Sequence, residues 1–285
     1  MITRDNIIAV VVWYHPTEEQ VQNLSSYASL VSATIIVDNS ETDHRHLLAS
    51  AALPNITYHP LLDNKGIAYA LNYGCRLALQ QGAAWLLTMD QDSRWEADQW
   101  ETYLQSANRY PAIMQVGVFS PRQDYASQRP IYATEYEEKP AVMTSGCLLS
   151  AFGFQKTDGF RDELFIDEVD NEYCFHCHQL GLQVVIINHA FLQHRLGEMR
   201  EVRIAGVLRK QYSDHAPFRY YYMVRNNLRL SQLYPQYHTF NKKRLRKMLK
   251  RIFLYDHVHK WESLRMCYRG WQDFRQGRFG KLKQE

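Results

Sequence analysis

The sequence predicts an α/β fold with a mostly parallel central sheet, because short apolar runs alternate with helical patterns along its first half. These runs are rich in Val, Ile and Leu and end in polar turns, which is typical of strands buried on both faces. The expected strands are 7–13, 34–37, 56–58, 85–89 and 182–187, with irregular strand-like segments within 116–150. The expected helices are 21–31, 47–51, 67–80, 167–180 and 220–234, followed by an amphipathic helix from Asn241 onward.

The length of 285 residues suits one large domain with a helical appendage. We expect a catalytic domain over 1–216 and a basic, amphipathic helical region over 217–285. The net charge of only +3 excludes nucleic acid as a partner on charge grounds. We find no signal peptide and no run of roughly 20 apolar residues. Five irregularly spaced cysteines indicate reduced thiols, as expected for a cytoplasmic protein.

The strongest single clue is the stretch from Trp85 to Ser93, in which an apolar run ends in two aspartates one residue apart. Asp90 and Asp92 are expected just past the carboxyl end of a strand, where open α/β sheets bind ligands. Residues i and i+2 of an extended chain point to the same side, so both carboxylates can face one ligand. Such a pair suits Mg²⁺ or Mn²⁺ carrying substrate phosphates. The alternative is a polar turn in which Asp92 or Ser93 caps a helix that starts near Trp95.

Two other expected strands also end in polar turns, Tyr14-His15-Pro16 and Asp38-Asn39-Ser40. A nucleotide could lie across this rim, with Asp38 accepting a hydrogen bond from a base N–H and Asp90 near the ribose. Asp38 could equally belong to a turn or cap a helix. Asn64-Lys65-Gly66 leads into a helix of small residues, where the backbone can approach a ligand closely and the helix N-terminus favours anions. Close packing of that helix on the sheet is an alternative, and both can hold together.

A dense acidic group opens the helix expected at 167–180; its members are Asp167, Glu168, Asp170 and Glu172. One of them could be a general base, and Asp167 and Asp170 would share a helix face at i, i+3. Acids in a first helical turn also simply stabilise a helix. Cys174 and Cys177 lack the second pair of a structural zinc site and are expected to pack. His194, at a strand end, could be a metal ligand beside Asp92 or a structural histidine.

These motifs, in this order, resemble family 2 of the GT-A glycosyltransferases, and most closely its bacterial rhamnosyltransferase branch. The resemblance covers roughly Ile7 to Leu230. It rests on the stretches VVVWYHP, IIVDNS, DNKGIAYALNYG, TMDQDS, TSGCLLS, FIDEVDNEYC, QHRLG and YYYMVRNN. It implies a Rossmann-like sheet flanked by helices, with a C-terminal helical extension. His176 departs from the arginine that the family often has there.

The resemblance also implies roles for individual residues. Asp170 would be the catalytic base, and Asp92 and His194 would bind Mg²⁺ or Mn²⁺. The donor-binding residues would be Tyr14, Asp38, Asn64, Gly66, Asp90 and Gln91. The residues at the acceptor or in the cleft would be Ser145, Gly146, Asp167, Glu172, Arg225 and Asn226, with Asp167 as the second choice for the base.

The reaction implied by the resemblance is an inverting, metal-assisted transfer of a sugar from a nucleotide-sugar donor, L-rhamnose from dTDP-rhamnose. The acceptor would be a saccharide of a bacterial surface polysaccharide such as O-antigen or capsule, with a polyprenyl-diphosphate-linked glycan as one candidate. The loops 123–139 and 194–217 are expected to shape the acceptor site. The alternatives are another donor such as a UDP-hexose or UDP-galactofuranose, a phosphotransferase with a nucleophilic aspartate, and a non-catalytic nucleotide-sugar-binding scaffold.

The region 241–285 has its own two interpretations. Seven Lys and Arg residues and no acid lie between Asn241 and Arg251, beside an apolar helix stripe. Such a helix could lie on an anionic membrane surface, each basic residue adding about 1 kcal/mol. That would place the protein peripherally on the cytoplasmic face of the inner membrane. Alternatively, the stripe packs on the domain and the lysines face water.

Overall fold

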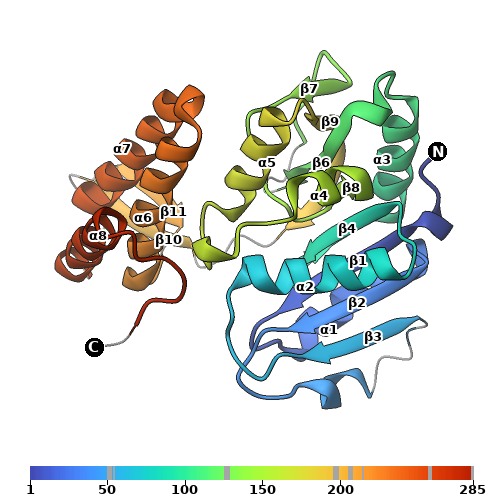
Figure 1. The fold of residues 1–285 in the computed structure, drawn as a ribbon, viewed down its shortest axis with the longest axis horizontal. Helices are drawn as coiled ribbons and strands as arrows, with labels where there is room; N and C mark the ends of the chain where they lie inside the picture. Colours follow the sequence, from blue (N-terminus) through green and yellow to red (C-terminus); the bar gives the residue numbers. More distant parts are fainter. Residues whose placement is uncertain are drawn as a thin grey trace. The chain divides into compact units, whose positions relative to one another are not determined.

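The computed structural model describes residues 1–49, 53, 55–124, 129–194, 199–204, 208–213, 215–255 and 259–283 (Figure 1). The chain divides into two compact units. The first unit contains Met1–Arg161 and Asp170–Arg195, and the second contains Asp162–Val169 and Leu196–Glu285. The acidic segment that the sequence singles out is therefore split, because Asp167 belongs to the second unit and Asp170 to the first.

The first unit contains the strands that the alternating pattern predicts, together with elements outside that pattern, among them the helices Ala97–Arg109 and Ala151–Thr157. Its strands are β1 (Ile7–Trp13), β2 (Ala33–Asp38), β3 (Ile56–Pro60), β4 (Trp85–Asp90), β5 (Ser93–Arg94), β6 (Val116–Asp124), β7 (Tyr136–Glu138), β8 (Cys147–Ser150) and β9 (Gln183–His194). Its helices are α1 (Glu18–Asn23), α2 (Ile67–Gln80), α3 (Ala97–Arg109), α4 (Ala151–Thr157) and α5 (Val169–Gln179).

These strands form one mixed sheet in the order β3-β2-β1-β4-β8-β6-β9-β5, with β7 added on β9. The four strands β3, β2, β1 and β4 are all parallel, as the sequence predicts. Beyond β4 the sheet turns antiparallel at β8, and only β6 and β9 pair in parallel again. The parallel half thus delivers several strand ends to one edge, and the remaining strands extend the sheet beside that edge.

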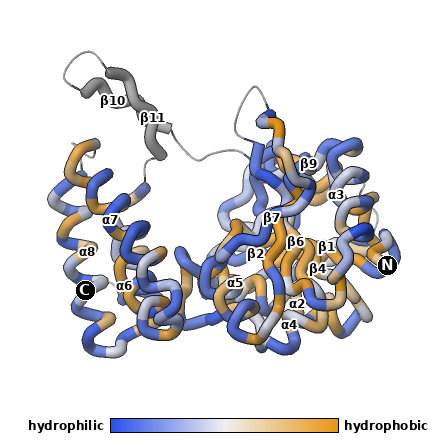
Figure 2. Tube along the Cα trace, turned by 90° about the horizontal axis from the view of Figure 1, so that it is seen from above, coloured by the Kyte–Doolittle hydropathy of each residue, from blue (hydrophilic) through white to orange (hydrophobic). Residues whose placement is uncertain are grey.

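The two faces of β1 explain why its sequence is apolar throughout. Ile7 and Trp13 point into a core cluster that includes Trp100 and Tyr103 of α3. On the opposite face, Val10 packs against α2. A Cβ added at Gly74 would come within 2.4 Å of Val10 Cγ1, so only glycine allows this approach of helix to sheet. Helices therefore cover both faces, and the hydrophobic segments concentrate on the central strands (Figure 2).

The second unit is mainly helical. It contains α6 (Pro217–Leu233), α7 (His238–Tyr255) and α8 (Lys260–Arg275), together with the antiparallel pair β10 (Met199–Ile204) and β11 (Leu208–Ser213). The apolar stripe of α7 packs inside this unit: Ile252 is buried, and Leu245 and Met248 contact the cluster formed with α6 and α8. None of the helices among the described residues is both long enough and apolar enough to cross a membrane.

Some predicted boundaries differ from the structure. The helix expected at 21–31 is α1 at Glu18–Asn23 followed by two 3-10 turns, and the one expected at 47–51 is a 3-10 turn at Arg45–Leu48. Residues 50 and 51, part of the QHRLG stretch at 195–197, and parts of the expected acceptor loops 123–139 and 194–217 lie outside the described residues. The helix after the two aspartates begins at Ala97 with Glu96 at its N-cap. Neither Asp92 nor Ser93 caps it, which removes the alternative interpretation of those residues.

Candidate active site

Three strand ends meet at one edge of the sheet, as the sequence predicts. Trp13 of β1 pairs with Asp38 of β2, and Val12 of β1 pairs with Asp90 of β4. The polar residues that follow these strands therefore start from adjacent positions. This is the carboxyl edge of the parallel strands, where open α/β sheets bind ligands.

A three-residue group with metal-ligand chemistry lies at this edge. Within the described part of the chain, Asp90, Asp92 and His194 are the only three His, Cys, Asp or Glu residues whose ligand atoms all lie within 4.8 Å of one another. His194 Nδ1 is 3.4 Å from Asp92 Oδ1. The short strand β5 causes this proximity, because it pairs antiparallel with the end of β9 and places Ser93 opposite His194.

A chain of hydrogen bonds through Ser145 and Ser93 connects Asp90 to His194. The backbone N–H of Asp90 donates to Ser145 Oγ at 3.1 Å, and Ser145 Oγ donates to Ser93 Oγ at 2.7 Å. Ser93 Oγ in turn lies 2.6 Å from His194 Nδ1. The resemblance places Ser145 at the cleft, whereas the sequence predicts Ser93 only as a possible helix cap. Its position directly after the two aspartates is the signal that could have identified it.

The electrostatics of the group suit a bound cation. The pKa of Asp90 is raised to about 7, first by burial and then by the neighbouring carboxylates of Asp92 and Asp170. Like charges held close together disfavour ionisation unless a cation neutralises them. Carboxylate oxygens with an imidazole nitrogen form a donor set that a divalent cation accepts. The residues present therefore fit an ion of this kind.

Asp170 lies in the first turn of α5 and belongs to the same electrostatic neighbourhood, since its charge contributes to the raised pKa of Asp90. Thr144 Oγ1 donates a hydrogen bond to Asp170 Oδ1 at 3.0 Å. This bond orients the carboxylate and favours its ionised form. Thr144 is not among the predicted site residues, although it directly precedes the predicted cleft residue Ser145.

Gly146 shapes the turn that leads into β8. Its φ is +79°, and a Cβ there would come within 2.7 Å of Leu192 and 3.0 Å of Pro121. Its N–H donates to the carbonyl of Thr88 at 2.7 Å. A side chain at this position would press on Leu192 and Pro121, so this turn beside Ser145 requires glycine.

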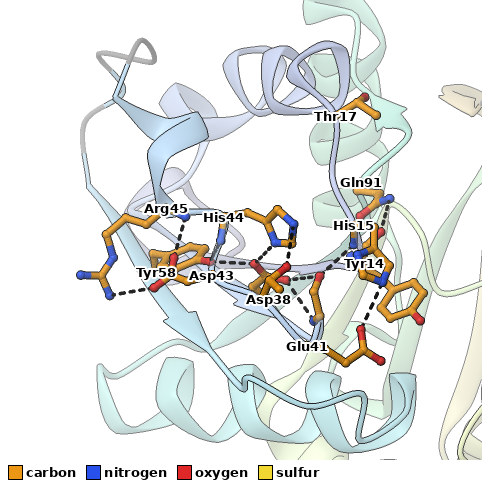
Figure 3. A network of polar contacts seen from close by, with 12 residues as sticks. Tyr14, His15, Thr17, Asp38, Glu41, Asp43, His44, Arg45, Tyr58 and Gln91 are labelled. Carbon is orange, nitrogen blue, oxygen red and sulfur yellow. Dashed lines mark hydrogen bonds and ion pairs between the residues drawn. The ribbon is translucent and has the colours of Figure 1, made fainter.

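Asp38 is fully enclosed. Its side chain has no exposed surface, and each of its two carboxylate oxygens has two hydrogen-bond partners (Figure 3). Ser40 donates to Oδ1 from its backbone N–H at 3.0 Å and from its hydroxyl at 2.5 Å. His44 Nδ1 lies 2.8 Å from Oδ2, and Tyr58 OH donates to the same oxygen at 2.6 Å. A base N–H that bonds directly to Asp38 has to replace one of these partners.

Gln91, between the two aspartates, is joined to Tyr14 at the end of β1. Its side-chain carbonyl accepts from the Tyr14 backbone N–H at 2.8 Å, and its amide nitrogen donates to the Tyr14 carbonyl at 3.2 Å. The Tyr14 side chain itself is 43% exposed. The predicted donor residue Gln91 therefore fixes the backbone of Tyr14 and leaves its ring accessible to a ligand.

Asn64 and Gly66 form a compact turn before α2. Asn64 Oδ1 accepts from the Gly66 N–H at 3.1 Å and from the Asn39 side chain at 3.2 Å. Gly66 has a φ of 89°, which glycine adopts without steric cost. The turn thereby joins the end of β2 to the start of α2, on the strand-end side of the sheet.

The remaining predicted cleft residues belong to buried ion pairs or to the second unit. Glu172 is buried and accepts from Arg161 Nε at 2.8 Å. Asp167 pairs with Arg219 at 2.5 Å and has a φ of 61°, so it precedes α5 and does not share a helix face with Asp170. This corrects the i, i+3 interpretation.

Arg225 and Asn226 are both completely buried in the second unit. The Asn226 amide donates to the carbonyls of Leu164, Ile166 and Asp167 at 2.8 to 2.9 Å. Arg225 donates to the carbonyls of Glu163, Leu164 and Gly280 at 2.7 to 3.3 Å. Both side chains therefore bind the backbone of one segment, which has left-handed residues at Phe165, Asp167 and Glu168.

The five cysteines are buried and free, and Cys174 and Cys177 of α5 pack in the interior as expected.

Comparison with known proteins finds a family model and a relative that match this sequence. The family described as Glycosyl transferase family 2 matches residues 22–166, about half of the chain. The chain is 29% identical over 239 residues to the dTDP-rhamnosyl transferase RfbF of Shigella flexneri, and the match covers 78% of each protein.

Solved structures share the fold at low sequence identity. A structure of S. aureus TarS with UDP-GlcNAc aligns over 96% of this chain and 81% of its own, with a TM-score of 0.56 and 15% identity. A structure of GalNAc-T7 with UDP, GalNAc and Mn²⁺ aligns over 70% of this chain and 44% of its own, with a TM-score of 0.52 and 12% identity. The family match and the GT-A-like arrangement of the sheet together show that the chain belongs to glycosyl transferase family 2.

Proposed function

We propose that this chain is an inverting, metal-assisted glycosyltransferase that moves L-rhamnose from dTDP-rhamnose onto a saccharide acceptor. The observation that carries the proposal is the gathering of Asp90, Asp92 and His194 at the carboxyl edge of the sheet, with Asp170 close enough to raise the pKa of Asp90. A diphosphate-bearing donor needs charge neutralisation, and an acceptor hydroxyl needs a base; this edge supplies residues for both.

Asp90, Asp92 and His194 would hold Mg²⁺ or Mn²⁺. When bound, the ion would neutralise the negative charge that develops on the leaving nucleoside diphosphate. Ser93 would keep the His194 ring oriented, as outer partners of metal-bound histidines do. Ser145 would hold both Ser93 and the Asp90 backbone, so that the ligands are in place before the donor arrives.

Asp170 would take the proton of the attacking acceptor hydroxyl. The pKa of a sugar hydroxyl lies far above neutral, so a base must accept the proton as the new bond forms. The hydrogen bond from Thr144 would orient this carboxylate toward the acceptor. One base and no enzyme nucleophile give a single displacement, which inverts the configuration at the anomeric carbon.

The donor assignment rests on the similarity to a dTDP-rhamnosyl transferase. Tyr14 would contact the base through its exposed ring. Asp38 would contribute either by exchanging one of its present partners for the base N–H or by positioning His44, whose side chain is 16% exposed. Asn64 and Gly66 would line the donor side near α2, and Asp90 would lie near the ribose.

The acceptor would be a saccharide of a bacterial surface polysaccharide, carried on a polyprenyl diphosphate. A lipid-carried acceptor would bring the region 241–285 to an anionic membrane surface. Arg225 and Asn226, being buried, would act on this site by holding the segment before Asp170 rather than by touching the acceptor.

Calorimetric titration of nucleotide sugars with and without Mn²⁺ tests the proposal. We expect dTDP-rhamnose to bind in a Mn²⁺-dependent way, and Asp92→Asn to abolish that dependence. Glu101→Gln, an exposed acid on α3, is the matched control and should behave as wild type. Preference for a UDP-sugar would overturn the donor assignment, and binding of no sugar nucleotide would overturn the proposed function.

A further inference from the structure

Helix α8 carries an exposed aromatic face in the second unit. Trp261 is 81% exposed, Tyr268 58% and Trp271 39%. Residues 261, 265, 268, 271 and 275 recur at helical spacing and so share one side of the helix. Large aromatic side chains gathered on one face of a helix are uncommon on a surface that meets only water.

This face points away from the rest of its unit. The buried side of α8 carries Ser263, Cys267 and Gly270, and a Cβ at Gly270 would come within 2.4 Å of the Tyr221 carbonyl oxygen of α6. Tyr221 OH also donates to Asp273 at 2.7 Å. The packing on α6 therefore fixes the rotation of α8 about its axis, and the aromatic face is the side that remains exposed.

Cations are interleaved with the aromatic rings. Tyr268 and Trp271 stack at 5.6 Å, and the Arg275 guanidinium lies 5.1 Å from the centre of the Trp271 ring. Arg265 is exposed on the same face. The two acids of α8, Glu262 and Asp273, fall outside it, so the face is aromatic and cationic without a negative charge.

The end of α7 carries further exposed apolar side chains. Phe253 is 53% exposed and Leu254 46%, and Lys260 at the start of α8 donates to the Phe253 carbonyl at 3.2 Å. Earlier in α7, between 241 and 251, the exposed residues are all basic, namely Lys242, Lys243, Arg244, Arg246, Lys247 and Lys250. The apolar stripe of α7 is packed inside the unit. The exposed surface of α7 is therefore mainly cationic, whereas α8 exposes aromatic side chains.

We propose that the Trp261–Tyr268–Trp271 face of α8 docks on an anionic lipid surface. Trp and Tyr prefer the boundary between headgroups and acyl chains, and neighbouring Arg and Lys side chains bind the headgroup phosphates. A protein partner or a second copy of this chain would have to present a matching acidic and apolar surface. The inference deepens the lipid-carried acceptor of the proposed function and rests on it for its biological meaning, but the docking itself can be measured without sugar transfer.

The tryptophans provide a direct reporter. Trp13, Trp85, Trp95 and Trp100 are buried, so of the six in the chain only Trp261 and Trp271 can reach a membrane. The full-length protein is mixed with phosphatidylcholine vesicles, with or without phosphatidylglycerol, that carry brominated acyl chains. We expect quenching and flotation with the phosphatidylglycerol vesicles and far less with phosphatidylcholine alone.

Variants separate this face from the rest of the surface. We expect Trp261→Ala to lower vesicle partitioning by about tenfold, the loss that one interfacial aromatic side chain implies. Phe152→Ala, which removes an exposed aromatic side chain of α4 in the first unit, should partition as wild type. Calorimetric binding of dTDP-rhamnose should be unchanged in both variants, which makes failure of docking distinguishable from failure of the proposed function.

Three results would overturn the docking proposal. One is the absence of quenching by brominated lipid, and another is equal partitioning of wild type and Trp261→Ala. The third is a wild-type protein that ignores vesicles but forms dimers in light scattering, with Trp261→Ala remaining monomeric, because α8 would then be an interface between two copies of the chain.

Discussion

Ser93 and His194 face each other across β5 and β9, and Ser93 Oγ lies 2.6 Å from His194 Nδ1. The two residues are 101 positions apart, and only the pairing of a two-residue strand brings them together. The hydroxyl that follows the two aspartates thus holds the ring that would complete the metal site. Loss of such a partner commonly lowers metal affinity by about 10- to 100-fold.

The first prediction is that Ser93→Ala weakens Mn²⁺ binding by about 10- to 100-fold while the fold is kept. The reason is that His194 loses the group that fixes its ring, and Ser145 loses an acceptor. Calorimetric Mn²⁺ titration measures the effect. Ser25→Ala, at an exposed position after α1, serves as control. Unchanged Mn²⁺ affinity in Ser93→Ala would show that this hydroxyl does not support the site.

The second prediction concerns the base. Asp170→Asn should lower turnover by about 10²- to 10⁴-fold, because no carboxylate remains to take the acceptor proton. Donor affinity should stay near wild type. Thr144→Val, which removes the hydrogen bond to Asp170, should cause a smaller loss of turnover and shift the acidic limb of the pH–rate profile upward. Steady-state rates over a range of pH measure both. A variant lacking the Asp170 carboxylate that keeps wild-type turnover would exclude Asp170 as the base.

The third prediction follows from the raised pKa of Asp90, about 7. A carboxyl whose folded pKa exceeds its unfolded value stabilises the fold when protonated. That contribution is fully present below about pH 4 and is lost as the pH rises through about 7. Without divalent ions, wild type should therefore lose stability relative to Asp90→Asn as the pH rises. Urea unfolding in EDTA at several pH values measures this, and parallel pH profiles of the two proteins would contradict it.

The fourth prediction concerns the buried amide of Asn226. Asn226→Ala leaves the carbonyls of Leu164, Ile166 and Asp167 without this donor, so we expect a loss of about 1–3 kcal/mol of unfolding free energy. Turnover should fall as well, because the segment it holds leads in sequence directly to Asp170. Urea unfolding and rate assays measure the two effects, with the exposed Gln236→Ala as control. If Asn226→Ala unfolded with the same free energy as wild type, the left-handed segment would not depend on the Asn226 amide.

Sequence reasoning located the strand ends well because their signal is local. An apolar run followed by Asp90 and Asp92 predicts both a buried strand and its polar end, and the register with β1 confirms the shared edge. The small-residue helix after Gly66 was likewise readable, since Gly74 packs directly on Val10. In such places the residue pattern and the tertiary structure depend on the same short stretch of chain.

The rest depends on distant contacts. The left-handed backbone at Asp167 is set by Asn226 and Arg219, about 50 to 60 positions away, so the acidic pattern alone indicated a helix. Asp38 is enclosed partly by His44 and Tyr58, and both of these residues lie outside the strand-end motif Asp38-Asn39-Ser40.

The proposed reaction depends on one divalent ion held by Asp90, Asp92 and His194. The most direct measurement is Mn²⁺ binding by electron paramagnetic resonance, in the presence of dTDP, for wild type, Asp92→Ala, His194→Ala and the control Glu101→Gln. We expect wild type and the control each to bind one Mn²⁺, and we expect binding to be lost or greatly weakened in both site variants. Equal Mn²⁺ binding by wild type and His194→Ala would contradict it.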